Sequence, residues 1–394
     1  MSDVIILDGD DFYPEAEIEN IEREQQDWEK AYLQISRKLL GYVASDSDTD
    51  NTVCSPYSFY ILLALALNAT SGKTQKEIKE LIAPGYSVKP LNEILKGVQQ
   101  SFSKQMKGGK LVSSNGICIE DNLYQNILDD FKQLVSKMYD AEIFQGGSDM
   151  VQKINDWVNE KTDGMIPKLM DEAPANLKMC LMNAIAFDAK WQIPYGEDDI
   201  YEEGEFNNAD GTVSEVPFMS STENDYIEDD YFTGFIKDYK GGRYAFMALL
   251  PKKENDKDFL AKGIEQIDFY KYYKERQSYE VYAEMPEFDC EMSRDLTDFC
   301  KKLGLETLFS PKSDFPGITK AEDIMVDSVI QKVVIKVNRA GTKAAAVTGM
   351  ICVAGCAPDF DNTKSVTLDR PFVYAIINKE YDGLPVFAGV VNHL

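Results

Sequence analysis

The sequence predicts one large α+β domain. Segments with helical spacing crowd the N-terminal part of the 394-residue chain, whereas β-prone segments crowd the C-terminal part. No internal repeat and no Pro- or Ser-rich linker separates two halves. The chain is 44% hydrophobic and 11% aromatic, which is enough apolar material to build a core.

The N-terminal region combines an acidic arm with a helix. Its first thirty residues hold eleven acidic and two basic side chains, and we expect residues 1–23 to form an arm, with Asp3–Asn20 as its loosest part. From about Glu24 apolar residues recur every three or four positions, which predicts a helix. These residues are Trp28, Tyr32, Ile35, Leu39 and Val43.

A second helix is predicted after Cys54. Ser55 can cap it and Pro56 can occupy its first position, and the apolar run to about Leu67 predicts that it is buried. Residues 73–110 then hold eight lysines against three glutamates. We interpret this segment as a lysine-bearing, solvated helix with a turn at Gly108-Gly109, and a polyanion site there is the weaker alternative.

The rest of the chain alternates strand-like segments with acidic ones. Helical spacing continues in Met150–Met170, and we expect acidic loops at 195–206 and 224–230. Residues 371–377 and 384–391 predict a C-terminal hairpin turned at 378–383. The other predicted strands are Leu181–Phe187, Tyr244–Leu250 and Ile324–Val337.

Composition excludes several classes of function. The single histidine, His393, lies next to the C-terminus, so Ser-His-Asp and Cys-His hydrolysis and most zinc chemistry are excluded. The seven cysteines lack CxxC spacing, which favours free thiols in a reducing compartment and predicts no metal site. No motif points to a cofactor, and no carboxylate pair is singled out for catalysis. We therefore expect a protein that is not an enzyme.

Net charge and hydropathy argue against two classes of binding partner, nucleic acids and membranes. With 41 basic and 67 acidic side chains the net charge is −26, which disfavours nucleic acid and anionic membranes as partners. The first eleven residues have no basic n-region, and no apolar stretch is long enough to cross a bilayer. We expect a cytoplasmic monomer and leave unconventional secretion open.

One segment near the C-terminus has an unusual composition. Small residues fill Gly341–Gly349, moderately apolar residues follow at 350–357, and a polar stretch follows at 358–364. Local propensity favours a short helix or a linker for the alanines. The alternative is a segment that can become an additional β-strand, because small side chains can enter between two existing strands without steric penalty.

Together with this segment, several motifs resemble the serpin family across nearly the whole chain. Val366–Ile376, VTLDRPFVYAI, is similar to the family's C-terminal signature. Ser55-Pro56 with Ser58, and Asn183-Ala184-Ile185 with Lys190-Trp191, are similar to two further family motifs. The stretch from Leu303-Gly304-Leu305 to Gly317-Ile318 resembles another, with Pro316 where serine is common.

The resemblance implies a single domain at 24–394 with three β-sheets, about nine helices and an exposed reactive-centre loop at about 339–365. It also implies a suicide-substrate inhibitor. A target protease attacks the loop and forms an acyl-enzyme, and it is displaced as the cut loop inserts into the central sheet. The runner-up is a non-inhibitory serpin that acts as a binding, carrier or chaperone protein.

The resemblance also assigns residues to three sites. Small, uncharged side chains match the hinge of inhibitory members, and Lys343 and Arg339 depart from the family's usual glutamates but should face solvent. The hinge residues are Gly341, Thr342, Lys343, Ala344, Ala345, Ala346, Val347 and Thr348. Trp191 matches the breach, where insertion begins. Ser55, Ser58, Asn183 and Gln331 match the shutter below it, with Gln331 in place of the usual histidine.

The scissile bond follows from the family's spacing. Counting about fifteen residues from Gly341 places it between Gly355 and Cys356, although the stretch to Pro371 is longer than usual. Alternatives are Cys356-Ala357, Cys352-Val353 and Met350-Ile351. Because residues 350–357 contain no Lys or Arg, we expect an elastase-like, chymotrypsin-like or papain-like cysteine protease as target, and no trypsin-like one.

Overall fold

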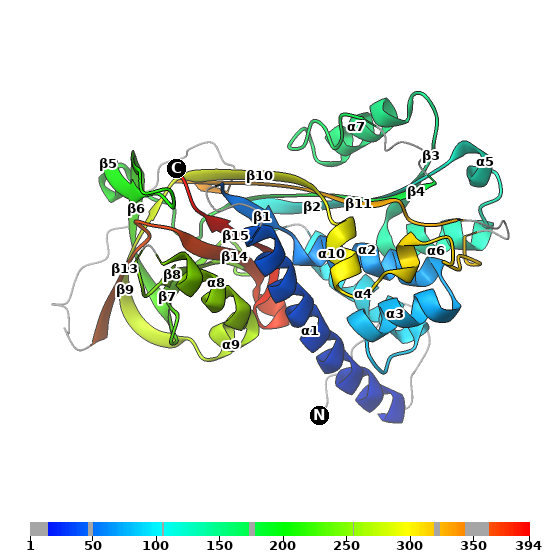
Figure 1. Cartoon of the computed structure of the whole chain (residues 1–394). Coiled ribbons are helices and arrows are strands. Elements are labelled where there is room, and N and C mark those ends of the chain that lie inside the picture. Colours follow the sequence, from blue (N-terminus) through cyan, green and yellow to red (C-terminus); the bar gives the residue numbers. More distant parts are fainter. Residues whose placement is uncertain are drawn as a thin grey trace.

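Two β-sheets and a set of flanking helices make up the protein. The computed structural model describes residues 15–45, 50–104, 106–172, 178–254, 256–318, 324–342 and 362–394, with the side chains of the first helix from Asp27 onward. Within these ranges, no helix is both long and apolar enough to cross a bilayer. The arrangement confirms the predicted α+β class (Figure 1).

Ten α-helices lie in the described residues, close to the number that we expected. They are α1 Glu15–Ala44, α2 Pro56–Ala69, α3 Gly72–Ile82, α4 Val88–Ser103, α5 Asp121–Tyr124, α6 Asp129–Tyr139, α7 Met150–Lys161, α8 Lys257–Gln266, α9 Phe269–Lys274 and α10 Thr297–Lys302. Helix α2 begins as predicted, since the Ser55 side chain accepts a hydrogen bond from the Ser58 amide at 3.2 Å.

The smaller sheet has six strands, in the order β10-β11-β12-β4-β2-β3. Its strands are β2 Gly109–Ile119, β3 Ala141–Gln145, β4 Met179–Lys190, β10 Phe288–Asp295, β11 Ser328–Asn338 and β12 Gly341–Thr342. Helix α7 covers one face and the α2, α4 and α6 helices lie on the other (Figure 1). These helices bury much of the sheet, whereas the outward side chains of its edge strand β10 are exposed to solvent. We call it the central sheet.

The larger sheet has nine strands. They are β1 Thr52–Cys54, β5 Ile200–Asn207, β6 Val213–Glu228, β7 Phe232–Asp238, β8 Tyr244–Pro251, β9 Gln277–Pro286, β13 Thr363–Thr367, β14 Phe372–Asn378 and β15 Leu384–Val391. Strands β14 and β15 form the predicted hairpin. The third expected sheet is continuous with this one, because the long β6 strand pairs with β9 and, at its end, with β7.

Three segments differ from the predictions. Helix α1 begins at Glu15, so residues 15–23 of the expected arm are helical, and residues 1–14 lie outside the described part. Glu, Arg and Gln residues are frequent before Trp28, and their high helix propensity favours extension of the helix toward the N-terminus. The acidic segments 200–206 and 224–228, expected as loops, belong to β5 and β6, whose outward side chains are exposed to solvent.

Candidate functional site

The candidate site is the junction between β4 and β11 in the central sheet. These strands are parallel neighbours, and Ser328–Val334 pair with Cys180–Ala186. Beyond Val334 the short β12 strand lies between them and is antiparallel to both. The central sheet is thus closed along its lower part and already holds an additional strand at its upper end.

Strand β12 contains the first two hinge residues of the sequence prediction. Gly341 pairs with Asn338 and Lys190, and Thr342 pairs with Val337 and Ala189. Gly341 has a φ of 146°, and a Cβ there would lie 2.1 Å from the Ala189 carbonyl oxygen, so only glycine fits. Lys343–Thr348 and the candidate scissile residues 350–357 lie outside the described residues.

Thr342 is anchored in the core. Its side chain is fully buried, and its hydroxyl oxygen lies 2.8 Å from that of Tyr239. Burial raises the pKa of the Tyr239 phenol, with the hydrogen bond to Thr342 acting in the opposite direction. The phenol is therefore protonated near neutral pH and can donate to the Thr342 hydroxyl.

Trp191, the predicted breach residue, lies beside this contact. Its ring stacks on Tyr239 with centroids 4.5 Å apart, and its indole N–H donates to the Asn338 carbonyl at 2.9 Å. The Trp191 amide donates to the Ala340 carbonyl at 3.2 Å. Trp191 therefore holds the turn between β11 and β12 from the end of β4.

A buried ion pair, Lys237 with Glu223, lies beside the Trp191 ring. The sequence analysis did not predict this pair. Lys237 is 3% exposed, its ammonium lies 2.7 Å from Glu223, and it lies 5.6 Å from the ring centroid of Trp191. Burial alone would lower the pKa of Lys237, but Tyr195 and Glu223 outweigh it and raise the pKa. The signal in the sequence was Lys237, which directly follows the apolar residues Phe235 and Ile236 in a β-prone segment.

Arg339 is 40% exposed, as expected for a side chain that faces solvent, and it also forms ion pairs that the sequence did not predict. Its guanidinium forms an ion pair with Glu287 at 2.9 Å, and Glu202 lies at 3.6 Å. Burial of Glu287 would raise its pKa, but hydrogen bonds from Arg339 outweigh burial and lower it. The turn at 339–340 is therefore fixed from both sheets.

The predicted shutter residues converge below the hinge. Gln331 pairs with Asn183 across the parallel ladder. The Gln331 side chain accepts from the Ser55 amide at 3.0 Å and donates to the Ser55 carbonyl at 2.9 Å, so glutamine connects the central sheet to the start of α2. The Asn183 amide group donates to Asn115 at 2.9 Å.

Two buried oxygens in this cluster are unpaired. Neither Asn183 Oδ1 nor Ser58 Oγ has a hydrogen-bond partner among the described residues. Leaving a buried acceptor unsatisfied costs about 1–3 kcal/mol. The cluster therefore has unused hydrogen-bonding capacity at the seam between β4 and β11.

The geometry defines a class of protein: one whose central sheet contains the two-residue strand β12 above a parallel pair of strands, β4 and β11. Comparison with known proteins gives the family. The family model "Serpin (serine protease inhibitor)" matches residues 30–394, and the chain belongs to the serpin family. Members of this family are named as inhibitors of serine proteases, not as enzymes.

Individual relatives are distant but match over most of their length. Iripin-4 of Ixodes ricinus is 28% identical over 375 residues, which are 90% of this chain and 92% of the relative. Leukocyte elastase inhibitor A of Rattus norvegicus is 27% identical and covers 86% of this chain and 92% of its own. The native state of the thermophilic serpin tengpin superposes with a TM-score of 0.84 at 30% identity, over 98% of this chain and 96% of tengpin.

Proposed function

We propose that this serpin is an inhibitory member, which traps a target protease as a covalent acyl-enzyme by inserting its cleaved loop between β4 and β11. One observation supports the proposal above the others: Thr342 already occupies the first inward-facing position of the slot. A carrier protein has no need of a hinge that fits this slot.

The pairing of β12 supports one register for continued insertion. If β12 is extended, Ala344 comes opposite Ile335 and Phe187, and Ala346 opposite Val333 and Ile185. These four partners are at most 2% exposed, so the entering side chains have to be small. Alanine at both positions meets this requirement without overpacking.

Side chains that alternate with these would enter beneath α7. Ala345 comes opposite Val334 and Ala186, and Val347 comes opposite Lys332 and Ala184. Ala184 and Ala186 belong to the apolar cluster that contains Ile154 and Val158 of α7. Small residues on β4 leave room there for an additional strand, so neither face of the seam requires a charged or bulky loop residue.

The expected gain in free energy comes from new backbone pairing. Insertion replaces one parallel ladder with two antiparallel ladders, and each net hydrogen bond contributes about 1 kcal/mol. Insertion of about 14 residues moves the acylated end by about 46 Å. These magnitudes are sufficient to carry a protease along the molecule and distort its active site.

The target class follows from the residues near the candidate bond. Residues 350–357 offer small and apolar side chains and no cation, so we propose an elastase-like or chymotrypsin-like serine protease, with a papain-like cysteine protease as the alternative. Gly355-Cys356 remains the first candidate for the cleaved bond.

The test is a panel of elastase-, chymotrypsin-, trypsin- and papain-like proteases mixed with the purified chain. We expect an SDS-stable complex with at least one non-tryptic protease, and the mass of the released C-terminal peptide identifies the bond. Cleavage by the whole panel without a complex, and without a rise in thermal stability, would instead support the non-inhibitory alternative.

A further inference from the structure

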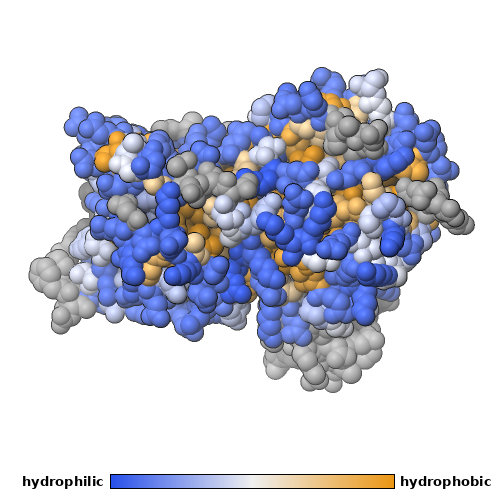
Figure 2. Space-filling model, in the orientation of Figure 1, coloured by the Kyte–Doolittle hydropathy of each residue, from blue (hydrophilic) through white to orange (hydrophobic). Residues whose placement is uncertain are grey.

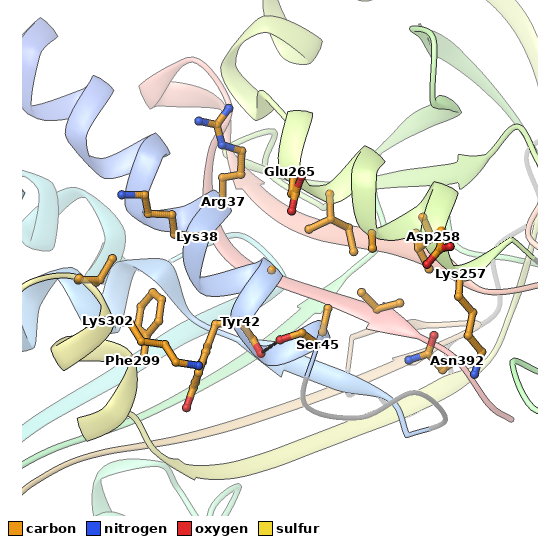
Figure 3. Close-up of a pocket in the computed structure, with 17 residues that line it drawn as sticks. Arg37, Lys38, Tyr42, Ser45, Lys257, Asp258, Glu265, Phe299, Lys302 and Asn392 are labelled. Carbon is orange, nitrogen blue, oxygen red and sulfur yellow. Dashed lines mark hydrogen bonds between the residues drawn. The ribbon is translucent and has the colours of Figure 1, made fainter.

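A groove lies on the surface away from the hinge. It runs between the C-terminal half of α1 and helix α8, with α10 at one end and β15 as its floor, and encloses about 670 Å³ (Figure 3). None of its lining residues belongs to β4, β11 or β12. We call it the α1–α8 groove, and its size is that of a small-molecule site.

The floor and walls of the groove are apolar. Leu260 and Ile264 of α8 and Val390 of β15 contribute aliphatic surface, and Tyr42 of α1 stacks on Phe299 of α10 with ring centroids 4.9 Å apart. Figure 2 shows hydrophobic surface in a hollow at the position where Figure 1 labels β15, between α1 and α8. Burial of the apolar part of a ligand against this surface would therefore be favourable in free energy.

Glycine keeps the groove open. Gly41 faces α8, and a Cβ built on it would lie 3.8 Å from Ile264 Cγ2. Glycine within a helix costs about 1 kcal/mol relative to alanine. At this position the missing side chain leaves the space between α1 and α8 empty.

Basic side chains gather at one end of the groove. Lys38 of α1 and Lys302 of α10 stand at the end formed by these two helices, Arg37 lies on the side of α1 that faces Glu265 of α8, and Lys257 stands at the other end (Figure 3). Among the described residues, no ion pair involves Arg37, Lys38 or Lys302, and the Lys302 ammonium lies 4.8 Å from the Tyr42 ring centroid. Three cations that form no ion pair among the described residues, beside an apolar floor, are unexpected in a chain of net charge −26.

We propose that the α1–α8 groove binds an amphipathic anion, with a carboxylate or sulfonate at the α1–α10 end and an aliphatic or aromatic body along Leu260, Ile264 and Val390. Charge complementarity selects the anionic head, since ammonium and guanidinium groups make short, strong hydrogen bonds with such groups. Asp258 and Glu265 also line the groove and disfavour a ligand that is anionic along its whole length. This proposal does not depend on the proposed protease inhibition.

Two probes test the proposal on the full chain. The fluorescent aryl sulfonate 1-anilinonaphthalene-8-sulfonate reports binding, and dodecanoate competes with it in a calorimetric titration. We expect one saturable site per chain, and dodecanol, which has the same body without the charge, should bind about tenfold more weakly or worse. Equal binding of dodecanol and dodecanoate would overturn the assignment of the cationic end.

Matched variants locate the site. Gly41→Leu should fill the groove and abolish binding, whereas Gly97→Leu, at an exposed glycine of α4 with no neighbouring atom within 4 Å, should leave it unchanged. Lys302→Glu should weaken dodecanoate binding about tenfold or more, whereas Lys262→Glu makes the same charge change on α8 outside the groove and should have no effect. Lys302 is exposed, so its variant keeps the test valid if Gly41→Leu fails to fold.

Unchanged binding by Lys302→Glu, or by a folded Gly41→Leu, would place the ligand elsewhere and overturn the proposal. Absence of saturable binding by the parent would overturn it too, and would leave a partner protein as the candidate occupant. Complex formation with proteases should be the same in all four variants, so failure here is distinguishable from failure of the inhibitory function.

Discussion

The hydroxyl oxygens of Tyr239 and Thr342 lie 2.8 Å apart in the core and connect the two sheets of the protein. Tyr239 directly follows β7 of the larger sheet, whereas Thr342 belongs to β12 of the central sheet. Trp191, at the end of β4, stacks on the same tyrosine. The start of the predicted hinge is therefore held by a contact between the two sheets.

Thr342→Arg should convert the proposed inhibitor into a substrate. Thr342 is fully buried between Val337 and Ala189, and a guanidinium there would have no acidic partner on either paired residue. On denaturing gels with a responsive protease, we expect the complex band to disappear and the cleaved band to increase. Thr342→Ser, which keeps a small hydroxyl side chain, should form complex like the parent. Equal trapping by Thr342→Arg would show that our hinge register is wrong.

Thr348→Val should weaken the cleaved form and spare the native form. Extension of β12 brings Thr348 opposite Asn183 and Gln331, where its hydroxyl can donate to the unpaired Asn183 Oδ1. Loss of this hydrogen bond should lower the stability of the cleaved protein by about 1 kcal/mol in denaturant unfolding. Thr348→Ser is the control. A cleaved Thr348→Val protein as stable as the cleaved parent would contradict the inserted register.

Lys237→Met should be strongly destabilising. It leaves the Glu223 carboxylate buried without its ammonium partner, which typically costs about 3–5 kcal/mol. The double variant Lys237→Met/Glu223→Leu should recover most of this loss in urea unfolding. The matched control is Lys252→Met, which breaks the exposed pair with Glu228 and should cost about 1 kcal/mol or less. A double variant no more stable than Lys237→Met would argue against a coupled pair.

Glu29→Gln should stabilise the protein at alkaline pH. Burial, with a contribution from Asp382 that Lys274 partly offsets, raises the pKa of Glu29 from 4.5 to about 7. In the unfolded chain the carboxyl loses its proton near pH 4.5, whereas in the folded chain it keeps the proton to about pH 7, so stability falls as pH rises through this window. After discounting for solvent screening, the variant should gain about 1–2 kcal/mol above this window.

The measurement is urea unfolding of parent and variant at about pH 4.5, where the gain should vanish, and at about pH 8. Asp27→Asn removes an equal charge from an exposed position on the same helix and should change stability little at either pH. A Glu29→Gln gain that is equal at both pH values would exclude the titration as its cause.

Local signals predicted much of the fold. Ser55 and Pro56 fixed the start of α2, and the two apolar runs near the C-terminus predicted the β14–β15 hairpin, because caps and hairpins depend on neighbouring residues. The start of α1 and the strands β5 and β6 were mispredicted. Acidic residues can occupy the solvent-facing side of a strand, and composition alone does not reveal this.

The candidate site, too, was predicted only in part. Motifs shared with the family predicted Trp191, Thr342, Asn183 and Gln331, and the structure brings these residues to one seam. Tyr239, the Lys237–Glu223 pair and the Arg339–Glu287 pair were missed. Glu287 lies 52 residues from Arg339, and Tyr239 lies 103 residues from Thr342. Pairings over such separations follow from the tertiary fold, which a single sequence does not display.

The short β12 strand affects the kinetics of the proposed insertion. To start a new strand, several residues must lose conformational entropy before the first stabilising hydrogen bond forms. The first step is therefore the least favourable one. Here two rungs, Gly341 with Asn338 and Thr342 with Val337, already form a nucleus. Insertion after cleavage would then extend the existing strand β12. Its rate would depend on how readily each later residue pairs with β4 and β11. In the proposed mechanism, deacylation by the protease would compete with this elongation alone, with no lag before insertion begins.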